Sequence, residues 1–205
     1  MNLGSVCCAA MLFVAPTTTM AVEPISKVIY LIRTHDVDSE VAKATFEFVR
    51  MNVQGTTRPD LGSVNIDPCC TRGMLRELSE LRTKDDALVI ALVGTSAPSG
   101  SPAVAYSEKL GSAAVMVEHL PSAESGMSEH RLAHIERAVI YAIGKLVGMP
   151  ICQNPYCVLS THHARKDQLP SRGFCPVCAD SARRRLMKFG VNEGTGTRRV
   201  SAPAS

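Results

Sequence analysis

Four cysteines in the last third of the chain have the spacing of a metal site. Cys152 and Cys157 are separated by four residues, Cys175 and Cys178 by two, and seventeen residues lie between the pairs. Each pair can supply two corners of the tetrahedron that zinc prefers. Two disulfides, or four unrelated thiols, are the alternative. The paired spacing favours one zinc ion, and a site closed by four thiolates is structural because it leaves no open position.

A helix-like run over 134–148 leads into Cys152-Gln-Asn-Pro-Tyr-Cys157, and Phe-Cys-x-x-Cys follows. This order of elements resembles that of the archaemetzincins, a family of zinc metallopeptidases. The family has His-Glu-x-x-His-x-x-Gly-x-x-His-Cys-x4-Cys and then Cys-x-x-Cys. In this register Gly148 falls on the glycine of the motif. Gly144 falls on the position just before the second histidine, where the family also has glycine. The resemblance implies a metzincin-like α/β fold, with a catalytic zinc in working members.

The catalytic residues of the family are absent from this chain. The three histidine positions fall on Tyr141, Lys145 and Ile151, and the glutamate position falls on Ala142. An ammonium with a pKa of about 10.4 offers zinc no lone pair at neutral pH, and a phenol with a pKa of about 10 would first have to lose its proton. Isoleucine has no ligand atom, and alanine cannot accept a proton from zinc-bound water. We therefore expect a pseudoenzyme, with a residual peptidase that uses other ligands as the alternative.

The helix predicted over 134–148 has two faces. His134, Arg137, Tyr141 and Lys145 recur at helical spacing and form a polar stripe, which by the resemblance would face metal and substrate in a working relative. Here the stripe could bind an anion, an acidic peptide or a phosphate backbone. The alternative is a solvated or ion-paired face. The opposite face is predicted to enter the core and consists of Ile135, Ala138, Val139, Ala142, Ile143 and Leu146.

The C-terminal end is basic. Residues 160–205 contain nine Lys and Arg against three Asp and Glu, although the net charge of the whole chain is +3. Such a basic end predicts an acidic partner, and RNA is the obvious candidate. Arg183, Arg184 and Arg185, on a helix predicted over 179–189, are the candidate contacts, unless they only complement the negative end of that helix. Few aromatic residues accompany these charges, which argues against stacking of single strands.

Alternating strand and helix patterns predict an α/β domain with a mixed, twisted sheet. Apolar runs at 27–33 and 87–93 are typical of strands buried on both faces. Short strands are expected at 62–66, 103–106 and 112–117. By the resemblance, helices pack on this sheet and a four-cysteine zinc subdomain follows it.

Two further helices are expected before the cysteine region. Asp38 is the predicted N-cap of the first and Thr71 of the second, and residues 55–59 form a turn cluster. The predicted inward positions of these helices are Val41, Ala44, Thr45, Phe48 and Val49, and Met74, Leu75, Leu78 and Leu81.

The N-terminal segment is apolar and carries no charge over residues 1–22. Its apolar run, residues 6–15, is too short to span a bilayer, and the basic start of a secretory signal is missing. An arm of this kind more often docks on a partner than stays in water. The expected parts of the chain are an apolar arm (1–24), an α/β core (25–150), a zinc segment with a basic helix (151–189) and a flexible basic tail (190–205).

The expected function is that of an inactive, zinc-containing structural or interaction subunit of a larger assembly. A ribonucleoprotein such as an organellar ribosome would suit both extensions. The alternatives are a residual peptidase, a free nucleic-acid binder, or an anion-binding module that uses His134, Tyr141 and Lys145. Of eight cysteines, four fit the zinc site and the others form adjacent pairs, which are poorly placed to bridge each other. We therefore expect a reducing compartment, either the cytosol or the mitochondrial matrix.

Overall fold

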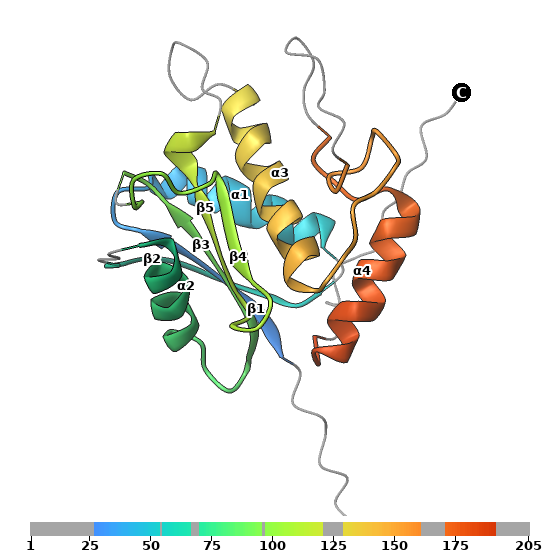
Figure 1. The fold of residues 1–205 in the computed structure, drawn as a ribbon, viewed down its shortest axis with the longest axis horizontal. Helices are drawn as coiled ribbons and strands as arrows, with labels where there is room; N and C mark the ends of the chain where they lie inside the picture. The colour runs from blue at the N-terminus through green and yellow to red at the C-terminus, as the bar shows by residue number, and fades with distance from the viewer. Residues whose placement is uncertain are drawn as a thin grey trace, which may run out of the picture.

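The computed structural model describes residues 27–53, 55–66, 70–95, 97–120, 129–160 and 171–191. The whole N-terminal arm (1–24) and most of the C-terminal tail (190–205) lie outside the described residues, so the predicted division into parts stays a prediction. The elements in chain order are β1 (Val28–Thr34), α1 (Ser39–Asn52), β2 (Thr57–Val64), α2 (Thr71–Glu80), β3 (Asp86–Val93), β4 (Val104–Ser107), β5 (Ser112–Met116), the short 3-10 helix η1 (Val117–His119), α3 (Glu129–Leu146) and α4 (Pro176–Lys188) (Figure 1).

The five strands form one mixed sheet in the order β2-β1-β3-β5-β4. The pairs β1/β2, β1/β3 and β3/β5 are parallel, whereas the edge strand β4 runs antiparallel to β5. Helices α1 and α3 lie on one face of the sheet and α2 lies on the other (Figure 1). The predicted fold class, a mixed sheet packed by helices, is confirmed.

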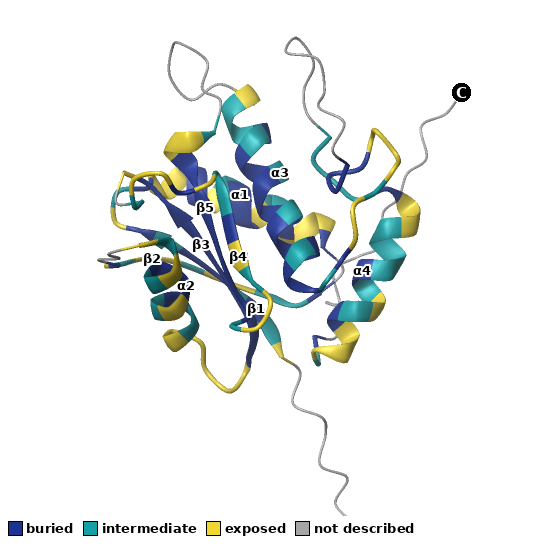
Figure 2. Cartoon of the chain, viewed as in Figure 1, coloured by how far each residue is buried: buried dark blue, intermediate teal, exposed yellow. Residues whose placement is uncertain are grey.

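The central strand β3 is buried along its whole length, as its unbroken apolar run predicts (Figure 2). Its side chains alternate between two hydrophobic cores, because successive residues of a strand point to opposite faces. Leu88, Ile90 and Leu92 enter the core shared with α1, α3 and α4. Val89 and Val93 enter the smaller core beneath α2.

Helix α1 begins at the predicted cap, but its buried face is rotated from the prediction. The Asp38 carboxylate accepts hydrogen bonds from the backbone N–H groups of Glu40 (2.8 Å) and Val41 (3.1 Å). Ala42 and Phe46 are buried in place of Ala44 and Phe48, which are only partly buried. Both sets fit a helical period, so the pattern alone left the orientation open.

Several boundaries differ from the sequence prediction, including those of α3, which spans Glu129–Leu146 instead of 134–148. Strand β2 starts at Thr57, inside the predicted turn cluster, because an edge strand tolerates Pro59. Helix α2 is capped by Cys70 instead of Thr71. Leu81, just past the end of α2, is 40% exposed, so its predicted inward position is wrong. Helix α4 starts at Pro176, a residue favoured in the first turn of a helix.

The two ends of the described chain lie side by side. The Lys27 backbone N–H donates to the Gly190 carbonyl at 2.9 Å, and Lys27 and Val191 form a parallel bridge. Val191 is fully buried, and Gly190 has a positive φ of 82° that suits glycine. Helix α4 is therefore fixed to the start of β1. None of the described helices is long and apolar enough to cross a membrane.

The segment that carries the cysteines packs directly on α3 at a glycine. A Cβ atom on Gly144 would lie 2.8 Å from Leu159 Cδ2 and 3.0 Å from Phe174 Cε1. Leu159 is buried and Phe174 packs against the same core. Gly144 therefore permits the close approach that places the cysteines next to the helix.

We expect Gly144→Ala to lower the free energy of unfolding by about 1 to 2 kcal/mol. The steric cost of overpacking, about 1 to 3 kcal/mol, exceeds the gain in helix propensity of at most about 1 kcal/mol. Gly173→Ala is the matched control, since nothing lies within 4 Å of its added Cβ. Denaturant unfolding of both variants tests the contact, and equal stability of the two would contradict it.

Candidate metal centre

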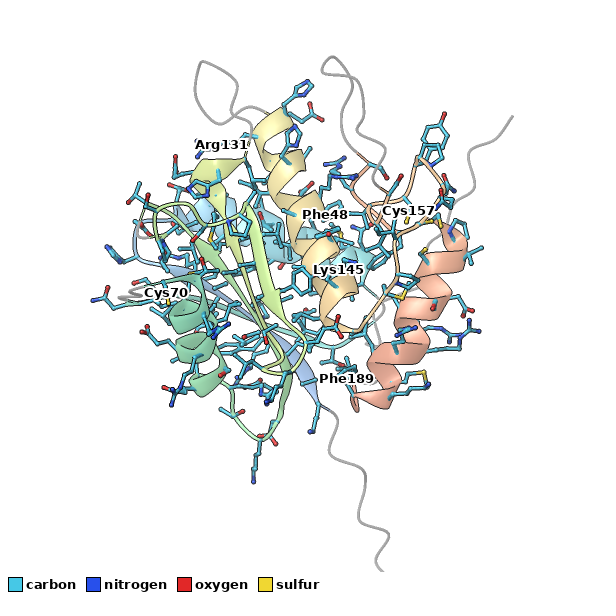
Figure 3. All side chains as sticks on the ribbon, viewed as in Figure 1. Phe48, Cys70, Arg131, Lys145, Cys157 and Phe189 are labelled. Atoms are coloured by element: carbon cyan, nitrogen blue, oxygen red, sulfur yellow. The ribbon has the colours of Figure 1, made fainter. Side chains whose placement is uncertain are left out.

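The four predicted cysteines come together in one cluster. The Sγ atoms of Cys152, Cys157, Cys175 and Cys178 all lie within 4.8 Å of one another. All four are free thiols, and Cys152 Sγ and Cys175 Sγ are 3.8 Å apart, too far for a disulfide. Four thiols in this arrangement fit one zinc ion. We call these four residues the clamp; Figure 3 labels Cys157 beside the start of α4.

The backbone around the clamp stabilises thiolates. The N–H of Asn154 donates to Cys152 Sγ at 3.4 Å, and the N–H of Cys175 donates to Cys157 Sγ at 3.5 Å. Cys175 is the N-cap of α4 and Cys178 lies in its first turn, where the helix dipole favours negative charge. Two chain segments thus present sulfur to one point, and backbone N–H groups of both segments donate to the sulfurs.

The chemistry of the donor set calls for a cation. Burial raises the pKa of the Cys157 thiol, and burial together with the neighbouring thiols raises the pKa of Cys178. Burial also acts to raise the pKa of Cys175, but hydrogen bonds involving the other three cysteines outweigh it and leave that pKa below its usual value. Ionising four thiols this close together costs free energy, because the thiolates repel one another. A divalent ion bound to all four sulfurs offsets that cost.

Helix α3 anchors the clamp through a half-buried arginine, Arg137. Arg137 Nη1 donates to the Ser171 carbonyl at 2.7 Å, and Nη2 donates to the Ser160 carbonyl at 3.5 Å. These carbonyls belong to the two chain segments that bring the cysteine pairs together. Arg137 was predicted from the sequence as an anion contact; the structure places its guanidinium on backbone carbonyls.

An ion pair next to Arg137 ties the same elements together. Glu136 is 4% exposed and accepts a hydrogen bond from Arg172 Nη1 at 2.8 Å. The Arg172 guanidinium also lies over the Phe48 ring, 5.3 Å from its centroid, and so reaches α1. Burial raises the pKa of Glu136, whereas Arg172 acts to lower it. Sequence patterns missed Glu136, because a carboxylate on the apolar side of a helix gives no periodic signal.

The four positions that align with the family's catalytic residues have different environments. Tyr141 and Lys145 are partly buried on α3, Ala142 is fully buried in the core, and Ile151 is 56% exposed beyond the helix. Burial, with Tyr106 nearby, raises the pKa of Tyr141, so its phenol stays neutral at physiological pH. Lys145 Nζ donates to the Met149 carbonyl at 3.4 Å and lies 5.9 Å from the centre of the Tyr141 ring.

Within the part of the chain that the structure describes, the clamp is the one group of three or more His, Cys, Asp or Glu residues close enough to share an ion. His134, the remaining member of the polar stripe, has its pKa lowered by burial and by the neighbouring cations Arg137 and His130. His134 is therefore largely uncharged at neutral pH. Anion binding by this stripe stays a prediction.

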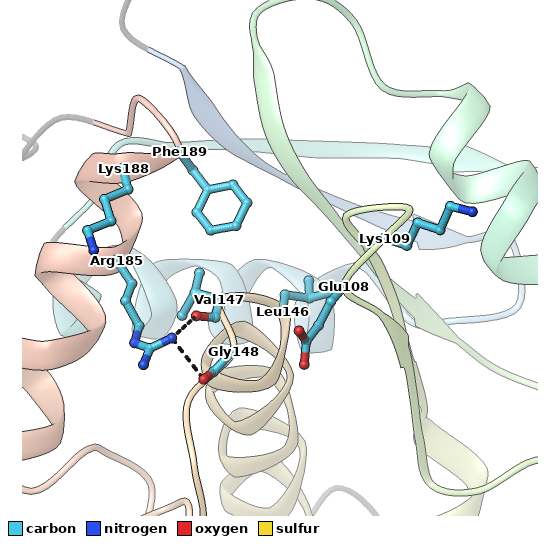
Figure 4. A pocket seen from close by; sticks show the side chains of 8 residues that line it. All are labelled: Glu108, Lys109, Leu146, Val147, Gly148, Arg185, Lys188 and Phe189. Atoms are coloured by element: carbon cyan, nitrogen blue, oxygen red, sulfur yellow. Dashed lines mark hydrogen bonds between the residues drawn. The ribbon is translucent and has the colours of Figure 1, made fainter.

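The predicted arginine contacts on α4 are engaged within the chain. Arg183 Nη2 lies 3.0 Å and Arg184 Nη1 lies 2.7 Å from the carboxylate of Asp180. Arg185 Nη1 donates to the carbonyls of Val147 (3.1 Å) and Gly148 (2.9 Å), at the end of α3 (Figure 4). Arg185 therefore satisfies helix-terminal carbonyls that have no partner inside the helix.

These contacts border a pocket of about 470 Å³ between the ends of α3 and α4. Two of its basic side chains do not face a common point, because Lys109 points away from Arg185 (Figure 4). The lining is formed by Glu108, Lys109, Leu146, Val147, Gly148, Arg185, Lys188 and Phe189.

We expect Cys175→Ser to abolish zinc binding and either to unfold the domain or to lower its melting temperature by at least about 10 °C. Structural zinc contributes about 10 to 16 kcal/mol in small zinc domains. Cys70→Ser is the control: Cys70 caps α2 through a 3.4 Å contact from Gly73, and serine caps helices well. Elemental analysis and thermal unfolding measure both effects. A Cys175→Ser protein with bound zinc and an unchanged melting temperature would rule out the structural zinc.

Arg137→Gln should weaken zinc binding by about tenfold, because residues that orient metal ligands from outside typically contribute that much. The Arg76→Gln variant is the control, since the Arg76 side chain is 77% exposed and pairs only with exposed Glu80. Competition with a fluorescent chelator gives both affinities. Equal affinity in the two variants would mean that the hydrogen bonds to Ser160 and Ser171 do not support the clamp.

Comparison with known proteins identifies the fold. No protein-family model and no curated protein sequence matches the chain. A zinc-dependent peptidase from Methanocorpusculum labreanum superposes with a TM-score of 0.56 at 18% identity, over 77% of this chain and 99% of that one. Archaemetzincin from Methanopyrus kandleri gives 0.52 at 16% identity, over 79% and 97%. Archaemetzincin from Archaeoglobus fulgidus, complexed with malonate, gives 0.54 at 16%, over 74% and 98%. The chain therefore has the archaemetzincin fold, as its cysteine spacing and helix order suggested.

Proposed function

We propose that this protein is a catalytically inactive relative of the zinc peptidases whose fold it shares, and that it serves as an interaction subunit of a larger assembly. The observation that carries the proposal is the set of side chains at the catalytic positions. Tyr141, Lys145 and Ile151 stand where the family has three zinc-binding histidines, and Ala142 stands where it has the glutamate.

The environment of these side chains supports inactivity. The Tyr141 phenol has a raised pKa, so it does not ionise to bind a metal near neutral pH. The Lys145 ammonium donates to a backbone carbonyl and brings a positive charge to the place where a catalytic ion would bind. Ala142 has no side-chain group that could act as a general base. Each of these features alone opposes metal-assisted hydrolysis.

The clamp has a physical reason to persist without catalysis. Structural zinc contributes about 10 to 16 kcal/mol to folding in small zinc domains, which is comparable to the whole stability of an ordinary domain, about 5 to 15 kcal/mol. Loss of a catalytic residue leaves folding intact, whereas loss of a clamp cysteine does not. A chain freed from selection for hydrolysis would keep the clamp for stability.

The role in an assembly is supported by the ends of the chain. The apolar N-terminal arm, which carries no charge over residues 1–22, suits contact with a protein, and the basic C-terminal end suits contact with RNA. A ribonucleoprotein, such as an organellar ribosome, would offer both partners. A reducing compartment, the cytosol or the mitochondrial matrix, would keep the clamp thiols available for zinc.

Metal content per chain tests the catalytic part of the proposal. We expect one zinc by elemental analysis, none in Cys152→Ser, and no peptide hydrolysis when zinc is added. Cys70→Ser serves again as the control for a cysteine outside the clamp. A second zinc, together with hydrolysis that rises with added zinc, would establish a residual peptidase and overturn the proposal.

A further inference from the structure

Large apolar side chains project into solvent around the clamp. Tyr156 is 81% exposed, Val177 is 79% exposed and Ile151 is 56% exposed. Each lies next to a clamp cysteine in sequence, and the clamp sulfurs are within 4.8 Å of one another, so the three flank one centre. Exposed residues mark the loop ahead of α4 and the first turn of α4 in Figure 2. We call Ile151, Tyr156 and Val177 the clamp face.

The backbone beneath Tyr156 is held rigidly. Its N–H donates to Asn154 Oδ1 at 2.9 Å, and its carbonyl accepts a hydrogen bond from the Ser171 hydroxyl. The next residue, Cys157, is fully buried and donates its N–H to the Asn154 carbonyl at 3.0 Å. An aromatic ring on a fixed backbone loses little conformational entropy when a flat group stacks on it.

Positive charge is concentrated on the same part of the molecule. The described residues 151–160 and 171–191 contain five basic residues and one acidic residue. The other described residues contain thirteen basic and thirteen acidic residues, so they are neutral as a whole. The charged residues of the clamp region are Arg172, Arg183, Arg184, Arg185 and Lys188, with Asp180 as the one acid.

The ion pairs within this region leave its charge positive. Asp180 pairs with both Arg183 and Arg184, whose side chains are 35% and 65% exposed. Exposed pairs of this kind are weak, so a polyanion can compete for the guanidinium groups. Arg184 lies seven residues after Val177, two helical turns along the same face of α4. The cation next to the clamp face is therefore accessible.

We infer that the clamp face and the first turns of α4 bind single-stranded nucleic acid, with Tyr156 stacking on a base and Arg183 and Arg184 contacting phosphates. An exposed ring on a rigid support beside a row of arginines is the combination that binds unpaired bases together with their backbone. Bases in a duplex are already stacked on each other, so the ring favours single strands. This inference rests on the proposed role in an assembly and names the partner's chemistry.

Sequence alone did not indicate this site, because Tyr156 is far from the arginines along the chain. Between Tyr156 and Arg183 lie the loop that joins the cysteine pairs and the second pair itself. The clamp brings these two segments together. Tyr156 therefore supplies an exposed aromatic ring to the basic region, which has few aromatic residues of its own.

Fluorescence anisotropy of the zinc-loaded, full-length protein with a labelled twelve-nucleotide oligouridylate tests the inference. Tyr156→Ala should weaken binding by about tenfold, and Tyr156→Phe should bind like the wild type, because stacking needs only the ring. Tyr106→Ala is the control for a partly exposed tyrosine on another element, since Tyr106 lies on β4 and is 38% exposed. Melting temperatures of all three variants exclude unfolding as the cause.

The electrostatic contribution has its own measurement. With two phosphates contacted, affinity should fall about sevenfold between 50 and 200 mM salt. Arg183→Gln with Arg184→Gln should make this dependence shallower. Comparing the affinities for oligouridylate and for oligothymidylate of the same length shows whether the site prefers RNA or DNA. A duplex of equal charge should bind more weakly than either single strand.

Three results would overturn the inference: no binding at low salt, equal affinity of wild type and Tyr156→Ala, or a preference for duplex. None of them bears on catalysis, which the zinc count and the hydrolysis assay test separately. If the strand does not bind but the protein still co-purifies with other proteins in a complex that Tyr156→Ala disrupts, the clamp face is a protein interface. The assembly role then stands, and the nucleic-acid site is wrong.

Discussion

The convergence of four thiols on one point is the constraint on which the rest of the structure depends. It joins the end of α3 to the start of α4 across a long connection. Buried thiols repel one another as they ionise, so the cluster is favourable only with a cation at its centre. Around it, Arg137, Glu136 and Gly144 form the surface of α3 that receives the cysteine segment.

Side chains of helix α3 support neighbouring backbone segments. In the sequence its polar stripe resembles a catalytic surface with the catalytic residues exchanged. In the structure, Arg137 and Lys145 donate to backbone carbonyls, and Arg185 of α4 covers the carbonyls at the end of the helix. Cations on a helix face can therefore stabilise neighbouring backbone as well as attract ligands. Their partners, not their spacing, distinguish the two roles.

The sequence predicted what depends on local pattern and on cysteine spacing. It identified the buried strand at 87–93, the cap at Asp38, the apolar face of α3 and the clamp. It did not predict which side of α1 is buried, because Ala44 and Phe48 fit the helical period as well as Ala42 and Phe46 do. It also missed the Glu136 ion pair and the position of Tyr156, since both depend on residues brought together only by tertiary packing.

The hydrogen bond between Lys27 and Gly190 gives this fold a property of its own. Because Lys27 and Val191 form a bridge, the start of β1 and the residues just after α4 lie side by side. A domain whose ends are adjacent can be inserted into a loop of another protein without distorting that loop, and it tolerates circular permutation. A partner that binds the chain before Lys27 would therefore also be close to the chain after Val191. Two weak contacts with the same partner would combine into one of much higher affinity.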